Sequence, residues 1–132
     1  MKHLIIIFGL LATFAVTSCD KSSTKLETND LVGTWNLIQV SGGITGQGYT
    51  AGFDAIKFTE STFDLLKSKS SIGSGTYVLN DTKDSLKITS APFTNESFAN
   101  IAAKKIDIDK NNLVLTEQCC DLYQYNFSRS LE

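Results

Sequence analysis

The chain has 132 residues, with 12 Lys or Arg against 14 Asp or Glu and a formal net charge of −2. This length suits one small domain with one hydrophobic core. The charges are scattered without a basic stripe, which excludes the electrostatic pattern of a nucleic-acid-binding protein.

The N-terminus is expected to be an export signal. Lys2 and His3 give it a short positive start, and an apolar run follows over residues 4–16. That run is shorter than the about 20 apolar residues that a membrane-spanning helix needs, and it has the length of a secretory signal.

The signal ends on Val16-Thr17-Ser18-Cys19, which resembles the bacterial lipobox. The alternative is an ordinary secretory signal that happens to contain a cysteine. The resemblance implies that residues 1–18 are removed as a lipoprotein signal peptide and that Cys19 carries the lipid anchor. We therefore expect a lipoprotein of the cell envelope, held on the outer membrane rather than the inner one and facing the periplasm.

The segment after the signal is polar. Residues 19–30 comprise the lipidated cysteine and the run DKSSTKLETND, which has too few apolar groups to fold and is predicted to be a flexible tether. Residues 31–132 then form the folded domain.

From residue 31 onward, short segments rich in β-branched and aromatic residues alternate with clusters of Gly, Asn, Asp and Ser. This pattern predicts an all-β fold with antiparallel neighbours. One helical turn is expected within residues 92–100. Eight strands beside one turn favour a closed up-and-down barrel, because closure removes exposed sheet edges. The predicted strands are residues 31–41, 53–59, 62–67, 75–80, 85–89, 103–108, 113–118 and 122–128.

The first strand carries Gly33-Thr34-Trp35, which resembles the Gly-x-Trp opening of the lipocalins and of the small lipocalin-like domains on bacterial lipoproteins. The resemblance implies that Trp35 plugs one end of an eight-stranded barrel and that Arg129, on the last strand, packs over its indole. The domain is shorter than a full lipocalin and lacks its long C-terminal helix. The META domain, another small envelope β-family, is a second resemblance, although this chain lacks the Gly-Cys-Asn segment typical of it.

A lipocalin-like barrel can be hollow or filled. A hollow one would bind or carry a small hydrophobic ligand, and the aromatic residues would line its cavity. A filled one would be an accessory or scaffold lipoprotein that acts through protein-protein contacts at the membrane. The candidate lining residues are Phe53, Phe58, Phe63, Tyr77, Tyr123 and Tyr125.

Catalysis is not expected. The only histidine, His3, leaves with the signal, and the chain has no nucleophile motif or acidic cluster with metal-binding spacing. Cys119 and Cys120 are adjacent, and we interpret them as a structural vicinal disulfide or a pair of inert thiols rather than a redox or metal site. We expect no cofactor, no metal and no nucleic-acid partner; the protein partner, if one exists, stays open.

Overall fold

The structure is a computed structural model, and it describes residues 28–92, 97–100, 103–118 and 123–131. The predicted signal peptide, Cys19, most of the predicted tether and the pair Cys119-Cys120 lie outside the described residues.

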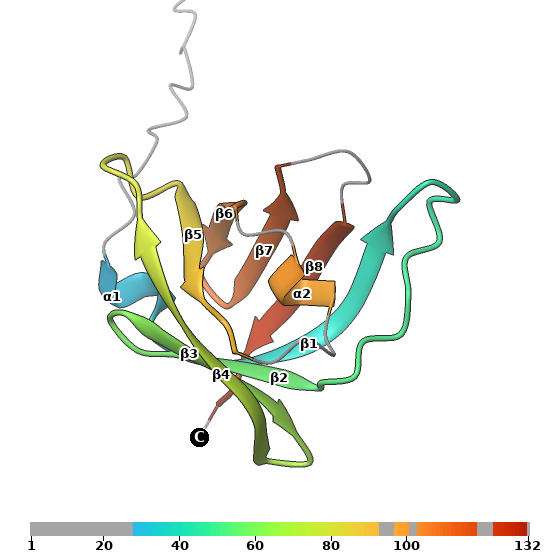
Figure 1. Cartoon of the computed structure of the whole chain (residues 1–132), viewed down its shortest axis with the longest axis horizontal. Coiled ribbons are helices and arrows are strands. Elements are labelled where there is room, and N and C mark those ends of the chain that lie inside the picture. Colours follow the sequence, from blue (N-terminus) through green and yellow to red (C-terminus); the bar gives the residue numbers. More distant parts are fainter. Residues whose placement is uncertain (1–27, 93–96, 101–102, 119–122, 132) are drawn as a thin grey trace, which may run out of the picture.

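Eight antiparallel strands form a closed barrel in which each strand pairs with its neighbours in sequence and β1 pairs with β8 (Figure 1). The prediction of an all-β, eight-stranded up-and-down barrel is therefore confirmed. The strands are β1 (Gly33–Gly42), β2 (Ala55–Phe58), β3 (Thr62–Lys67), β4 (Ser70–Leu79), β5 (Ser85–Ser90), β6 (Ala103–Asp109), β7 (Asn112–Glu117) and β8 (Tyr123–Arg129).

Side chains alternate between the inside and the outside of the barrel. In β2, for example, Ile56 and Phe58 are buried while Lys57 between them is exposed. In β6, Asp107 and Asp109 are both exposed, and they alternate with the more buried Ile106 and Ile108. The two-residue repeat of apolar side chains in the sequence thus matches the alternation of inward-facing and outward-facing side chains in the barrel wall.

β1 interrupts this alternation with a bulge. Its pairing with β8 shifts between Leu37 and Gln39, and the extra residue, Ile38, is 64% exposed. A bulge moves the inward positions by one residue. Trp35 and Val40 are therefore both buried in the barrel, although an odd number of steps separates them.

Two differences from the predicted elements exceed a shift of one or two residues at a strand end. Helix α1 (Thr28–Leu31) occupies the end of the predicted tether and the start of the predicted first strand. β4 begins at Ser70 rather than residue 75, because Ser68 and Lys69 form a two-residue turn with φ of 49° and 66°. Positive φ at both central residues matches the right-handed twist of a hairpin, so strands β3 and β4 can pair up to the turn. The predicted helical turn contains α2 (Ser97–Asn100).

α1 covers one end of the barrel, which we call the Trp35 end. Leu31 and Trp35 are fully buried there, and the Trp35 indole N–H donates to the Leu31 carbonyl at 2.8 Å. The Arg129 guanidinium lies 4.1 Å from the Trp35 ring centroid and donates to the carbonyls of Val32 and Asp30. The contact expected between Arg129 and Trp35 is present.

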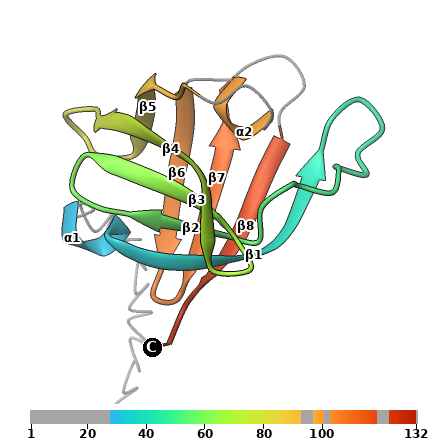
Figure 2. The ribbon, with the colours of Figure 1, turned by 60° about the horizontal axis from the view of Figure 1, so that its bottom comes forward.

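α2 lies near the other end, where β8 begins and β7 finishes (Figure 2). We call it the Tyr125 end, after the buried tyrosine beside Val40.

Candidate functional site

A buried ion pair lies inside the barrel at the Tyr125 end. Lys104 on β6 and Glu117 on β7 are 0% and 3% exposed, and the Lys104 Nζ is 3.4 Å from the Glu117 Oε1. They are the buried charged side chains among the residues that the structure describes. Taking two charges out of water costs several kcal/mol per ion before their mutual attraction offsets it. Such a pair is unusual in a small apolar core.

Tyrosine hydroxyls extend the polar network away from Glu117. The Tyr125 hydroxyl donates to the Glu117 Oε1 at 3.0 Å and lies 3.1 Å from the Tyr49 hydroxyl. The Tyr123 backbone N–H donates to the other carboxylate oxygen, Oε2, at 3.3 Å. Because a carboxylate only accepts, Tyr125 uses its single proton on Glu117, and Tyr49 is therefore the donor to Tyr125.

Aromatic faces surround the ammonium group. The Lys104 Nζ lies 4.6 Å from the ring centroid of Phe98 on α2 and 5.3 Å from that of Tyr125. Both distances are within the range of a cation–π attraction, which is strongest where water is excluded. The cation therefore has a carboxylate and two rings as neighbours.

Strand alternation explains why these charges face inward. Lys104 has the same parity as the buried Ile106 in β6, and Glu117 has the same parity as the buried Leu115 in β7. Lys104 and Glu117 are paired across the two strands. This charged pair continues the alternation of the apolar residues, but it was not predicted from the sequence.

The glycine-rich loop after β1 positions Tyr49. Gly48 has a φ of +70°, its N–H donates to the Gly42 carbonyl at 2.8 Å, and a side chain on it would collide with the Val40 carbonyl. Tyr49 is part-buried, with its ring 4.9 Å from that of Tyr123 in an edge-to-face contact. This loop is thus folded back onto the Tyr125 end.

Burial shifts two pKa values of the network. Desolvation lowers the pKa of Lys104 from 10.5 to about 8, although the neighbouring Glu117 opposes this shift. Desolvation also raises the pKa of Tyr125, and its hydrogen bond with Tyr49 adds to the increase. Tyr125 therefore remains a neutral donor at physiological pH.

Five of the six predicted lining residues form two groups. Phe58, Phe63 and Tyr77 lie toward the Trp35 end, where Tyr77 packs edge-to-face on Phe58 and donates to the Thr59 carbonyl at 2.6 Å. Tyr123 and Tyr125 belong to the polar network at the other end. All six are buried except Tyr123, which is partly exposed.

Phe53, the sixth candidate, lies between these groups and contacts Phe98. The two ring centroids are 5.7 Å apart, and Phe98 also packs on Phe63 at 5.8 Å and on Tyr125 at 5.1 Å. Phe98 is fully buried. A single side chain of α2 thus fills the middle of the barrel beside Lys104.

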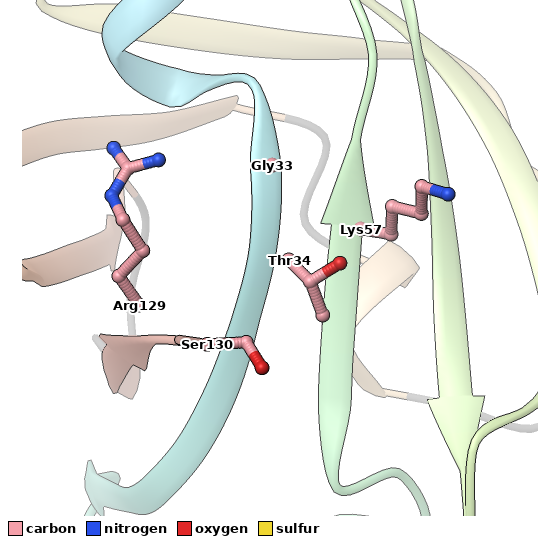
Figure 3. A pocket seen from close by; sticks show the side chains of 5 residues that line it. All are labelled: Gly33, Thr34, Lys57, Arg129 and Ser130. Atoms are coloured by element: carbon pink, nitrogen blue, oxygen red, sulfur yellow. The ribbon is translucent and has the colours of Figure 1, made fainter. Parts of the chain in front are cut away.

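A surface pocket of about 280 Å³ lies at the Trp35 end (Figure 3). The ion pair lies at the opposite end of the barrel. Its lining comes from β1, β2 and the end of β8: Gly33, Thr34, Lys57, Arg129 and Ser130. The guanidinium of Arg129, one of these five residues, is already engaged by Trp35 and two carbonyls.

The described residues contain no group of three or more His, Cys, Asp or Glu side chains that could hold a metal ion. Within the same ranges, no helix is long and apolar enough to cross a membrane. Comparison with protein-family models, with curated proteins and with solved structures returned no match. The ion pair and its tyrosines are therefore the candidate site on physical grounds alone.

The lowered pKa of Lys104 predicts a pH-dependent stability. Between about pH 8 and 10 the unfolded state binds the lysine proton while the folded state has released it, so the free energy of unfolding rises with pH. The double variant Lys104→Met/Glu117→Leu lacks both charges and serves as the reference. In urea denaturation, the free energy of unfolding of the wild type should rise by about 1–2 kcal/mol relative to that of this variant between pH 8 and pH 9.5.

Higher pH is avoided in this measurement because tyrosine ionisation lowers the stability of both proteins there. Burial raises the pKa of Tyr77 to about 12, above its unfolded value of 10, so ionisation of this group destabilises the fold above pH 10. A stability difference that stays flat or falls between pH 8 and 9.5 would show that Lys104 is not desolvated in the folded protein.

Proposed function

We propose that this protein is a lipid-anchored protein of the cell envelope whose lipocalin-like barrel binds a small hydrophobic ligand at the Tyr125 end. The observation that carries the proposal is the buried network of Lys104, Glu117, Tyr125 and Tyr49 inside an otherwise aromatic interior. Ligand sites are mostly apolar with a few fixed polar groups that orient the guest.

Stability alone gives no reason to keep this network. Replacing a buried ion pair with well-packed apolar residues is often neutral or stabilising. A filled barrel of this size would be served as well by Met and Leu at positions 104 and 117. The cost of the pair is more readily explained if its polar groups orient something that enters the barrel.

Phe98 holds the place that such a ligand would take. Its ring lies among Phe53, Phe63 and Tyr125 and against the Lys104 ammonium group, yet it comes from a four-residue helix and not from the barrel wall. An apolar guest that displaced this ring would meet the same aromatic faces. Binding would then exchange one buried apolar group for another.

The anchor in this proposal is Cys19. The first described residue, Thr28, is nine positions later and begins the helix that covers the Trp35 end. The lipid would therefore attach through that end, and the Tyr125 end would lie opposite the attachment. Outer-membrane placement on the periplasmic face belongs to the same proposal.

A second candidate is an accessory or scaffold lipoprotein with a filled barrel that acts through protein-protein contacts. The contacts of Phe98 favour it, because they join the aromatic residues of both ends into one packed cluster. In that case the outer wall would carry the function, and the interior would bind nothing.

Ligand binding is tested with the neutral fluorescent probe N-phenyl-1-naphthylamine. The mature chain, residues 19–132, is produced with Cys19→Ser so that it carries no lipid. Wild-type sequence in this background should bind one equivalent of probe with increased emission. The Phe98→Leu variant should bind the probe about 5–10 times more tightly than wild type. Leucine is smaller than phenylalanine and has no ring, so it competes less well with the probe for the space beside Lys104.

The matched control is Ile38→Ser, which removes an apolar side chain that is 64% exposed on the outer wall. It should leave probe affinity unchanged. Absence of binding by the wild-type barrel, or binding that Ile38→Ser abolishes, would favour the filled barrel over the carrier.

Lipidation is tested in cells. Globomycin blocks the lipoprotein signal peptidase, so treated cells should accumulate a lipidated precursor that is 18 residues longer than the mature chain. Cys19→Ser should abolish incorporation of radiolabelled palmitate. If globomycin leaves the processing of the chain unchanged, the lipobox interpretation of residues 16–19 is wrong.

A further inference from the structure

The charges around the candidate site cancel. Among the described residues, the buried charged side chains are one cation, Lys104, and one carboxylate, Glu117. Arg129 lies at the Trp35 end, engaged by the indole of Trp35 and by two backbone carbonyls. The buried charges of the described residues that a ligand meets at the Tyr125 end therefore sum to zero.

Glu117 already neutralises the lysine. Its Oε1 accepts from Lys104 and Tyr125, and its Oε2 accepts from the Tyr123 backbone N–H. These three donors fix the carboxylate in position. A second anion would have to lie beside it to reach the same ammonium group.

We infer, on the basis of the proposed function, that the ligand is an uncharged amphiphile: an apolar chain with a neutral hydrogen-bonding head group, not a fatty-acid anion. A carboxylate guest would place two like charges next to one cation and leave one charge uncompensated in an apolar interior. A cationic guest would likewise leave one charge uncompensated, in this case a positive one.

A neutral head group fits the tyrosine hydroxyls. Tyr49 and Tyr125 form a directional hydrogen-bonded chain that ends on Glu117. A hydroxyl both donates and accepts, so an alcohol can join such a chain by exchanging with one of its members, and an ester carbonyl can accept from it. Neither requires a proton or a charge to be moved.

The test compares four ligands with the same twelve-carbon chain length below their micellar concentrations: dodecanol, methyl dodecanoate, dodecanoate and dodecylammonium. Each displaces N-phenyl-1-naphthylamine from the Cys19→Ser mature chain at pH 7. Dodecanol and methyl dodecanoate should each bind at least ten times more tightly than either ion. Equal or tighter binding of dodecanoate or dodecylammonium would overturn the inference while leaving ligand binding intact.

Glu117→Gln tests whether the ion pair sets this preference. The substitution keeps the size and an accepting oxygen of the side chain but removes the negative charge that Glu117 places beside Lys104, and dodecanoate can supply that charge instead. The dodecanoate-to-dodecanol affinity ratio should rise at least tenfold over wild type, whereas Ile38→Ser should leave it unchanged. An unchanged ratio in folded Glu117→Gln would overturn the inference.

The two proposals fail differently. If the wild-type chain binds neither the probe nor any of the four ligands, the proposed function itself is wrong. The four-ligand comparison on wild type is valid whether or not Glu117→Gln folds. Circular dichroism shows whether this variant is folded before its dodecanoate-to-dodecanol affinity ratio is interpreted.

Discussion

A cation and a carboxylate, Lys104 and Glu117, face each other inside a barrel whose other buried described side chains are apolar or tyrosine. Each charge is tolerable there only because the other is within 3.4 Å. The carboxylate in turn orients Tyr125, and Tyr125 orients Tyr49 across the end of the barrel. The direction of the hydrogen bonds along the tyrosine chain depends on this one pair.

The two ends of the barrel handle polar groups in different ways. At the Trp35 end, the indole N–H and the Arg129 guanidinium donate to backbone carbonyls of α1 and of the residue after it. These hydrogen bonds therefore fix side chains to the backbone. At the Tyr125 end, side chains bond mainly to side chains, and the aromatic ring beside them comes from a short helix. The first arrangement is that of a structural plug, and the second is where we propose that a ligand binds.

The sequence predicted the barrel well because its signal is local: alternation identifies inward residues, and turn clusters separate the strands. The same alternation places Lys104 and Glu117 inside, but charged residues are so often exposed that the pattern was applied only to the apolar positions. The sequence predicted a helical turn that includes Phe98, but a short segment between strands has no period that would show which side chains Phe98 contacts. The bulge at Ile38 was also invisible, because it depends on pairing between β1 and β8.

A crystal structure of the mature chain with dodecanol tests the central claim most directly. We predict that the ligand hydroxyl lies within hydrogen-bonding distance of Tyr49 or Tyr125, that the alkyl chain occupies the place of the Phe98 ring, and that Lys104 and Glu117 remain paired. An alkyl chain bound to the outer wall, with Phe98 still packed on Phe53 and Lys104 at saturating dodecanol, would contradict it.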